Sequence, residues 1–306
     1  MNDFIKNFIK NPIYRFNILN RLGYYNYLND EEFLKKEFKI RMGRELNLNE
    51  PKSFNEKLQW LKLYYREPLL TDLVDKYNVR SYIKNTIGKD FLIPLLGMWD
   101  NPDDINFDIL PDQFVLKCNH NSGVGLCICK DKKQLNKDLI IKKLKKGLHE
   151  NYYIHNREWP YKNVKRRVIA EKYIHDEEKN YLTDYKFYCF NGKAKYLYVA
   201  KGLDEHRTAQ MSFLTLDWEF AYFGRSDYKP LSSLPKKPTK LKEMIEIAEI
   251  LAKDFPFVRV DLYQIGEKIL FGELTFSPCG GFMPFSPEAA DRMVGNDLVL
   301  PSISKK

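Results

Sequence analysis

Alternating apolar and polar positions indicate short strands in several parts of the chain, and the most regular run lies near its carboxyl-terminal end. Residues 257–263 (FVRVDLY) alternate with the period of a strand that buries one face, and residues 269–276 (ILFGELTF) do the same. The residues between them are mostly polar and include Gly266, which is typical of a turn. The stretch is therefore predicted to be a β-hairpin centred near Glu267.

This hairpin would set two carboxylates against each other. With its centre near Glu267, Asp261 lies opposite Glu273, and Arg259 lies opposite Thr275 on the same face. Directly opposed side chains lie ~4.5–5.5 Å apart, so like charges there repel. A cation such as Mg²⁺ would remove the repulsion, because it binds carboxylate and phosphate oxygens together. If only the spacing is considered, an ordinary hairpin with a solvated polar face is the somewhat better explanation. Arg259 beside the two acids, and the glycine-rich segment SPCGG (277–281) after the second strand, favour a metal site.

The same alternation predicts further strands. The dipeptide Asn191-Gly192 between two such runs is the strongest short-range signal of a hairpin. Strands are expected at residues 114–119, 126–130, 168–174, 184–190, 193–200, 213–218 and 220–223. Helices are expected among them at residues 132–146 and 240–253, the second capped by Thr239.

Helical spacing dominates the first 90 residues. Asn29 with Glu32, and Ser53 with Glu56, have the spacing of capping boxes at the start of two helices. A third helix is expected over residues 71–87.

The third helix would carry Lys76 and Arg80 four residues apart, and so on one face. Two interpretations stay open. The face is solvated, with Asp72 and Lys76 as an i,i+4 pair, or it is a cationic patch for phosphate.

A glycine-bearing turn follows the strand predicted at 114–119. Residues 121–125 (NSGVG) could offer backbone N–H groups to phosphate oxygens, with Lys117 at the root of the loop as a point charge. The signal is weak, because the segment matches neither GxxxxGK[ST] nor GxGxxG.

Composition limits the classes of function. The chain has 306 residues, 44% of them hydrophobic, which suffices for two domains or subdomains. A net charge of +9 favours anionic partners such as nucleotides, acidic sugars, nucleic acid or anionic lipid. The five cysteines lack zinc-ligand spacing and are expected to be reduced, as in the cytoplasm. No apolar run approaches the ~20 residues of a membrane span, and the first residues do not have the pattern of a signal peptide.

Two segments mix aromatic and basic residues. Residues 1–27 begin with an amphipathic helix over residues 4–9, which suits an anionic membrane surface, although packing on its own domain is the more common role. Residues 152–161 could stack bases or sugar rings, although a packed surface loop is more common.

Lysines on three separate elements (Lys76, Lys117 and Lys186), a glycine loop, and an acidic pair beside Arg259 are the parts that phosphoryl transfer requires. No Ser-His-Asp or Cys-His set is visible, and the five histidines are scattered.

Seven motifs carry a resemblance to a known family. They are FNEKLQWLK (54–62), DKYNVRSYI (75–83), FVLKCNHNSG (114–123), EKYI (171–174), DYKFYCFNGK (184–193), VRVDLY (258–263) and GELTFSPCGG (272–281). In this order and spacing they resemble the ATP-grasp superfamily, and within it the TupA-like branch associated with cell-surface polysaccharide and teichuronopeptide synthesis. The resemblance covers roughly residues 50–285.

The resemblance implies an α+β fold in which two antiparallel-sheet subdomains clasp ATP, preceded by a helical N-terminal region. The expected units are residues 1–110 for the helical region, 111–174 for a lid, and 175–306 for the C-terminal part with the metal site.

The resemblance also implies roles for the nucleotide site. Lys117 would hold the α- and β-phosphates, and Lys76 and Lys186 would add charge nearby. Glu171, with the backbones of Lys172 and Ile174, would form the hinge that reads adenine. The ribose would lie on Glu178, and the loop that closes over the phosphates would include Asn119, Ser122, Gly123 and Gly125.

For the reacting end, the resemblance implies that Asp261 and Glu273 carry Mg²⁺, with Mn²⁺ as a substitute, and that Arg259 stabilises the transferring phosphate. Many relatives have Asn where this chain has Thr275, which weakens its assignment as a third ligand. Substrate contacts are assigned only weakly, to Arg207, Ser277, Gly280 and Gly281.

The implied reaction is ADP-forming ligation of a carboxylate to an amine through an acyl phosphate. The carboxylate would belong to a sugar acid, a peptide or an amino acid, and the product to a capsule-type polymer. The expected location is the cytoplasm, with the N-terminal segment as a peripheral contact at the inner face of the membrane. Nucleic acid is not an expected partner.

Three rival functions remain. A glycosyltransferase would use a nucleotide-sugar with a metal-bound acidic pair, but it often shows an Asp-x-Asp motif that this chain lacks. A non-catalytic module for acidic polymers would tolerate loss of Asp261 or Glu273. A small-molecule kinase would stop at a phosphorylated product and need no amine.

Overall fold

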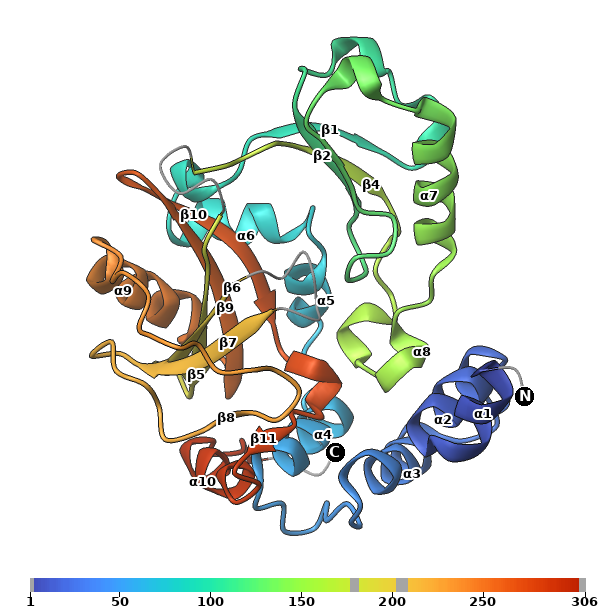
Figure 1. Cartoon of the computed structure of the whole chain (residues 1–306), viewed down its shortest axis with the longest axis vertical. Helices are drawn as coiled ribbons and strands as arrows, with labels where there is room; N and C mark the ends of the chain where they lie inside the picture. The colour runs from blue at the N-terminus through green and yellow to red at the C-terminus, as the bar shows by residue number, and fades with distance from the viewer. Residues whose placement is uncertain (1–2, 177–181, 202–208, 303–306) are drawn as a thin grey trace.

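The protein is built on two antiparallel sheets joined by helices, as the α+β prediction expects. The computed structural model describes residues 3–176, 182–201 and 209–302. Figure 1 shows the smaller sheet at the top, the larger sheet on the left, and the first helices at the lower right.

The larger sheet has five strands in the order β10-β9-β5-β6-β7. Its strands are β5 (Asp184–Phe190), β6 (Lys193–Lys201), β7 (Gln210–Thr215), β9 (Phe257–Ile265) and β10 (Lys268–Thr275). The predicted hairpin at Asn191-Gly192 is confirmed, since β5 pairs with β6 across it. Below this sheet, β8 (Gly224–Arg225) pairs with β11 (Phe285–Ser286).

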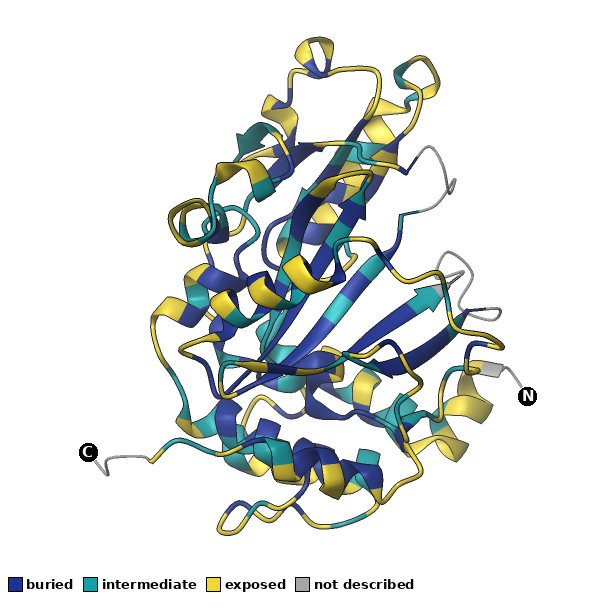
Figure 2. Ribbon diagram, turned by 90° about the vertical axis from the view of Figure 1, so that its left-hand side faces the viewer, coloured by how far each residue is buried: buried dark blue, intermediate teal, exposed yellow. Residues whose placement is uncertain are grey.

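Both faces of the larger sheet are covered. Helix α9 (Leu241–Ala252) packs on one face, where Phe187, Val260 and Leu262 are buried. Helices α4 (Phe54–Tyr64) and α10 (Ala290–Asp297) pack on the other face, against an aromatic cluster. Figure 2 shows the resulting buried positions along the strands.

The smaller sheet has four strands in the order β1-β4-β2-β3. They are β1 (Leu95–Trp99), β2 (Phe114–Cys118), β3 (Cys127–Cys129) and β4 (Val168–Lys172), with α7 (Lys137–His149) against β2. Its edge strand β1 precedes residue 111, so the sheet draws on the region expected to be helical. The division of the chain at residues 111 and 175 stays a prediction.

Four helices open the chain, and the last two begin where their capping residues predict. They are α1 (Asp3–Lys10), α2 (Pro12–Arg21), α3 (Asp30–Met42) and the already named α4. The backbone N–H of Glu32 donates to Asn29 at 2.9 Å, and that of Glu56 donates to Ser53 at 3.2 Å, with reciprocal bonds in both cases. Both predicted capping boxes are confirmed.

Two helix predictions are wrong in detail. The helix expected over residues 71–87 is two helices, α5 (Leu69–Val74) and α6 (Val79–Thr86). Thr239 does not cap α9, because its hydroxyl accepts a hydrogen bond from the Gln264 amide at 2.6 Å instead.

Three further boundaries differ. The lysine-rich helix begins at Lys137 behind an Asn136 cap, and residues 132–134 form a separate 3₁₀ turn. The segment 152–161 contains the short helix α8 (Tyr153–Asn156) and a second 3₁₀ turn. Residues 220–223 form no strand, because the chain turns at Trp218, where φ is 71°, and makes only a single bridge at Phe220.

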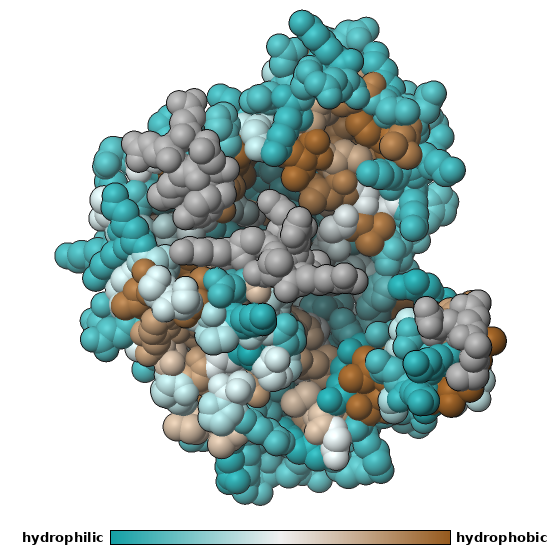
Figure 3. Space-filling view, in the orientation of Figure 1, coloured by the Kyte–Doolittle hydropathy of each residue, from teal (hydrophilic) through white to brown (hydrophobic). Residues whose placement is uncertain are grey.

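The surface is mostly hydrophilic, with apolar side chains gathered on the smaller sheet and around the first helices (Figure 3). All five cysteines are free thiols, as predicted. Among the described residues, the structure has no helix long and apolar enough to cross a bilayer.

Candidate functional site

The β9–β10 hairpin pairs Asp261 with Glu273 and Arg259 with Thr275, as predicted. The pairing does not arise from the expected symmetrical hairpin centred near Glu267. The turn is the two residues between Ile265 and Lys268, and a bulge between Phe271 and Glu273 then shifts the register by one residue. Without the bulge, Glu273 would lie opposite Val260, whose side chain is in the core beneath α9.

Gly272 occupies the bulge, where a side chain would be crowded. A Cβ at this position would lie 3.0 Å from the Asp261 carbonyl oxygen and 3.1 Å from the Tyr263 ring. The bulge reverses the alternation of β10, so Leu274 enters the core and Glu273 joins the polar face.

Arg259 bridges the two acids. Its Nε donates to Asp261 Oδ1 at 2.7 Å, and its Nη2 donates to both Asp261 Oδ2 and Glu273 Oε1 at 2.7 Å. Thr275 Oγ1 also donates to Glu273 Oε1, at 3.0 Å. The repulsion expected between two opposed carboxylates is therefore relieved by a guanidinium within the protein.

Lys186, on the neighbouring strand β5, adds a second cation beside Asp261. Its ammonium contacts Asp261 and also Asp184. Burial opposes its charge, but the two carboxylates raise the pKa of Lys186 well above the ordinary value. Burial also disfavours the charged form of Asp184. It raises the pKa of Asp184 to about 6, although the Lys186 ammonium acts to lower it.

Glu273 is ionised and accessible. Burial would raise its pKa, but the Arg259 guanidinium and the Lys76 ammonium hold that pKa at about 2. Its side chain is 42% exposed, whereas that of Asp261 is 1% exposed. Glu273 can therefore accept a cation directly, while Asp261 would have to part from Arg259 or Lys186.

The residues predicted for Mg²⁺ fit such an ion in part. Two carboxylates beside a nucleotide's phosphates are a sufficient protein contribution to a Mg²⁺ site. Among the residues that the structure describes, no cluster of three or more His, Cys, Asp or Glu side chains could hold a metal alone. Phosphate oxygens would have to complete the coordination.

A cavity of about 170 Å³ separates Glu273 from the glycine loop, residues 119–125. It is lined by Glu273 on one side and by Lys76, Lys117, Ser122 and Gly123 on the other. The acidic hairpin and the predicted phosphate-binding lysine thus face one space.

Lys76 reaches this cavity because the helix breaks before it. Asp75 is buried, and its Oδ1 accepts the N–H groups of Tyr77 at 2.8 Å and Asn78 at 3.3 Å, which ends α5 and starts α6. The Lys76 ammonium donates to the Asn121 carbonyl at 2.7 Å, and its N–H donates to the Asn119 carbonyl at 3.0 Å. The Asp72–Lys76 pair on a continuous helix is not present, since Asp72 bonds Asn78.

Asn119 serves the loop rather than the cavity. Its side-chain Nδ2 donates to the Lys165 carbonyl at 2.9 Å, and its Oδ1 accepts from the Arg167 N–H at 2.7 Å. It is fully buried. A direct contact with a ligand through this side chain would break both bonds.

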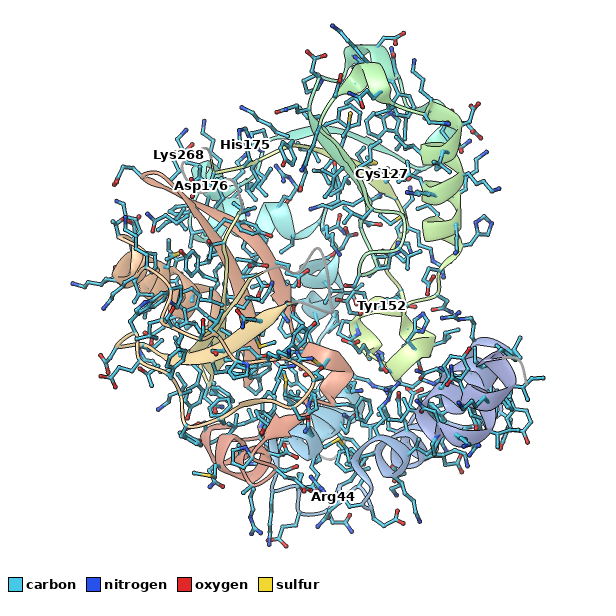
Figure 4. The ribbon with its side chains drawn as sticks, in the orientation of Figure 1. Arg44, Cys127, Tyr152, His175, Asp176 and Lys268 are labelled. Atoms are coloured by element: carbon cyan, nitrogen blue, oxygen red, sulfur yellow. The ribbon has the colours of Figure 1, made fainter. Side chains whose placement is uncertain are left out.

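Glu171 forms ion pairs with two cations and precedes Lys172, which lines a second pocket. Its carboxylate lies 2.6 Å from Lys117 Nζ and 3.4 Å from Arg80 Nη1. The pocket, of about 580 Å³, is lined by Lys172 and Ile174 together with apolar residues of three other segments, Leu92, Pro94, Ile265 and Leu270. Figure 4 shows His175 and Lys268 near each other at its rim.

Two of the predicted residues are not placed, and three others do not line the cavity. Glu178 and Arg207 lie outside the described residues. Ser277, Gly280 and Gly281 lie in the segment that leaves β10, four to eight residues after Glu273.

The sequence interpretation named Arg80 only as part of an alternative cationic patch, and it did not assign Tyr161 to the site. Arg80 lines the larger pocket and pairs with Glu171. Tyr161 lies beside Glu273 and Lys76, and its ring packs on Tyr152, with centroids 4.6 Å apart. The aromatic composition of residues 152–161 was the available signal for Tyr161.

We compared the chain with protein families and with known proteins. A family model described as "TupA-like ATPgrasp" matches residues 56–299. No curated protein is similar enough in sequence to match the chain.

Solved structures with a similar fold include three ligases or synthetases. D-alanine–D-alanine ligase from Bacillus anthracis is 17% identical, with a TM-score of 0.41 over 68% of this chain and 59% of that chain. The enzyme of the same name from Helicobacter pylori is 16% identical, with a TM-score of 0.42 over 81% and 70%. A D-cycloserine synthetase is 12% identical, with a TM-score of 0.41 over 75% and 70%. The chain thus spans about 59% of the length of the Bacillus anthracis ligase.

Proposed function

Because the chain belongs to the TupA-like ATP-grasp family, we propose that it is an ATP-dependent carboxylate–amine ligase that works through an acyl phosphate. The observation that carries the proposal is the cavity in which Glu273 of β10 faces Lys76, Lys117 and the glycine loop. Anionic phosphates between cations and an acidic edge that can hold a metal ion match what phosphoryl transfer requires.

In this proposal the larger pocket takes adenine. Lys172 and Ile174 would offer backbone groups to the base, and the apolar residues opposite would cover its faces. Lys117 would exchange part of its contact with Glu171 for the α- and β-phosphates. Lys76 would leave the Asn121 carbonyl for phosphate, while Ser122, Gly123 and Gly125 close over it. Glu178 would contact the ribose.

Asp261 and Glu273, with Thr275 at the margin, would hold Mg²⁺ or Mn²⁺. A cation bound there would neutralise charge on the phosphates. Arg259 already donates to both acids. It would stabilise negative charge on the transferring phosphoryl group, and Lys186 would hold the Asp261 carboxylate in position.

The reaction divides into two displacements. A substrate carboxylate oxygen attacks the γ-phosphorus and the bond to ADP breaks, which leaves an acyl phosphate. An amine nitrogen then attacks the acyl carbon, phosphate departs, and the nitrogen loses a proton to give an amide. Positioning and charge stabilisation suffice for both steps, so no protein nucleophile is required.

The proposed carboxylate is a sugar acid, a peptide or an amino acid used in cell-surface polysaccharide synthesis, and the amine an amino acid or simple amine. Arg207 and the segment from Ser277 to Gly281 would contact these substrates. The proposed location is the cytoplasm, with residues 1–27 at the inner face of the membrane.

Release of ADP from Mg²⁺-ATP, across a panel of carboxylates with and without amines, tests the proposal. Asp261→Asn and Glu273→Gln should each lower kcat by about 100-fold or more, because each removes a carboxylate that would hold the metal ion at the transferring phosphate. Glu267→Gln is the matched control, since Glu267 lies at the tip of the same hairpin and is 83% exposed.

Circular dichroism should show that all three variants are folded. Full activity in either acid variant would contradict the metal assignment. A product that accumulates as a stable phosphate, with no effect of added amine, would point to a kinase instead.

A further inference from the structure

The segment that leaves β10 is held in an uncommon backbone conformation. Cys279, Gly280 and Gly281 have φ values of 55°, 64° and 78°. A Cβ at Gly280 would lie 2.7 Å from Asn156 Cγ, and one at Gly281 would lie 2.5 Å from Gln59 Nε2. The two glycines therefore allow α8 and α4 to approach the backbone, and this exit loop (residues 277–282) is shaped by contacts with distant parts of the chain.

One polar stripe of α4 supplies most of those contacts. Gln59 Nε2 donates to the Gly281 carbonyl at 2.6 Å, and Lys62 Nζ donates to the Gly280 carbonyl at 2.7 Å. Asn55 bonds both the N–H and the carbonyl of Met283, at 2.7 and 2.9 Å. The spacing of four and then three residues places all three side chains on one face of the helix.

Lys62 also joins the loop to a third segment. Its ammonium donates to the Asn156 carbonyl at 2.8 Å and lies 5.0 Å from the centre of the Phe282 ring. A single side chain of α4 thus links α8 to the exit loop.

The charge of Lys62 is costly in this position. The residue is 3% exposed. Burial lowers its pKa to about 8, although the nearby carboxylates of Glu37 and Glu158 favour the charged form. A methionine would avoid that cost, but it would leave the buried carboxylates of Glu37 and Glu158 with less positive charge nearby, and loss of one member of a buried ionic group is destabilising. The ammonium supplies hydrogen bonds to two carbonyls that methionine could not make.

We propose that Lys62 is a positioning residue that holds the exit loop in its left-handed conformation beside the reacting groups. Through Asn156 it also ties the loop to the wall formed by residues 152–161. The part of this inference that concerns catalysis rests on the proposed function, in which the exit loop contacts the carboxylate or the amine. Lys62 itself does not line the cavity and does not contact Asp261 or Glu273.

The chain offers a matched control on the same helix. Lys57 donates to the carbonyls of Gly295 and Leu298 at 2.8 and 2.7 Å, so it too makes two bonds to backbone, but at the end of α10. Lys57→Met and Lys62→Met therefore remove the same chemistry from α4 at two different places.

Two measurements on the loop need no substrate. Cys279 is the one exposed cysteine of the five, so its alkylation rate under non-denaturing conditions reports on the exit loop. In Lys62→Met the rate of alkylation at Cys279, and amide exchange over residues 279–283, should rise about tenfold, because two charge-assisted bonds are lost. Lys57→Met should match the unaltered protein in both.

A kinetic split tests the catalytic part. In Lys62→Met the KM for the carboxylate or amine should rise at least about fivefold, while the KM for ATP should stay within about twofold. Gln59→Met, which removes only the neutral bond to Gly281, should shift the same quantities in the same direction by less. It also keeps the inference testable if Lys62→Met does not fold.

The outcomes separate cleanly. Unchanged alkylation and exchange in both loop variants, or an equal rise in Lys57→Met, would overturn the positioning role. An equal rise in the KM values of ATP and acceptor would overturn its link to catalysis. If the unaltered protein releases no ADP with any acceptor, the proposed function fails, and the alkylation and exchange results still decide whether Lys62 holds the loop.

Discussion

Among individual residues, Arg259 and Lys117 each lie beside an opposite charge, and the buried histidine does not. Arg259 contacts Asp261 and Glu273, and Lys117 contacts Glu171. His120 is 2% exposed in the glycine loop, and its Nδ1 has no hydrogen-bond partner among the described atoms. Its Nε2 bonds the Glu150 carbonyl at 3.0 Å. Arg259 and Lys117 therefore have oppositely charged partners, whereas a proton on His120 would bury a charge that has no such partner.

Acid should destabilise the fold through His120. Burial lowers its pKa from 6.5 to about 4. Because the unfolded chain binds this proton first, the stability that neutral His120 contributes is complete above pH 6.5 and is lost as the pH falls towards 4. Between pH 7 and pH 5 the loss should be about 1–2 kcal/mol.

Urea unfolding at the two pH values would measure this loss. His120→Gln should show a smaller difference between them, and the exposed His149→Gln should behave like the unaltered protein. An equal pH dependence in His120→Gln would contradict the assignment.

Among the elements, two interruptions place the charged groups. The bulge at Gly272 turns Glu273 to the polar face, and the break at Asp75 brings Lys76 to the glycine loop. An uninterrupted strand and helix would have sent both side chains elsewhere. The positions of Glu273 and Lys76 thus depend on local departures from regular structure.

Gly272→Ala tests the first interruption. The added methyl group would crowd the Asp261 carbonyl and the Tyr263 ring, so unfolding stability should fall by about 1–3 kcal/mol. Displacement of Glu273 should also lower ADP release. In Gly266→Ala, at φ 53° with open space around it, only stability should fall, by about 1 kcal/mol. Equal kinetic effects in the two variants would contradict the role given to the bulge.

These interruptions also mark where sequence-based prediction succeeded and failed. Capping boxes at Asn29 and Ser53, and the turn at Asn191-Gly192, depend on neighbours within a few residues and were predictable. The change in apolar alternation at Gly272 was readable, but a symmetrical hairpin gave the same pairing. The hydrogen bonds from Arg259 to both Asp261 and Glu273 could not be predicted from the sequence, because the direction of a side chain depends on packing across strands.

At the scale of the whole molecule, the two-helix unit α1–α2 and the turn after it carry much of the exposed apolar surface. The exposed fractions reach 50% for Phe4, 59% for Ile9 and 77% for Leu22. Lys6, Lys10, Arg15 and Arg21 surround them, in a chain of net charge +9. Apolar groups among cations suit the surface of an anionic bilayer.

Vesicle sedimentation would test this contact. The protein should bind phosphatidylglycerol vesicles and not phosphatidylcholine vesicles, and binding should weaken in 0.5 M salt, because added salt screens the lysines and arginines. Ile5→Ser with Ile9→Ser should reduce binding about fivefold or more. Ile109→Ser with Ile128→Ser alters equally exposed positions elsewhere and should not. Equal binding to both lipids would contradict the proposal.

The position of α4 has a consequence for biosynthesis. Its lysines bond carbonyls that lie 218 and 241 residues further along the chain. A ribosome adds about 5–20 residues per second, so these donors wait roughly 10–50 s for their acceptors. The polar side chains of α4 can stay hydrated during that interval, whereas apolar side chains at the same positions would add to the surface that promotes aggregation of the nascent chain.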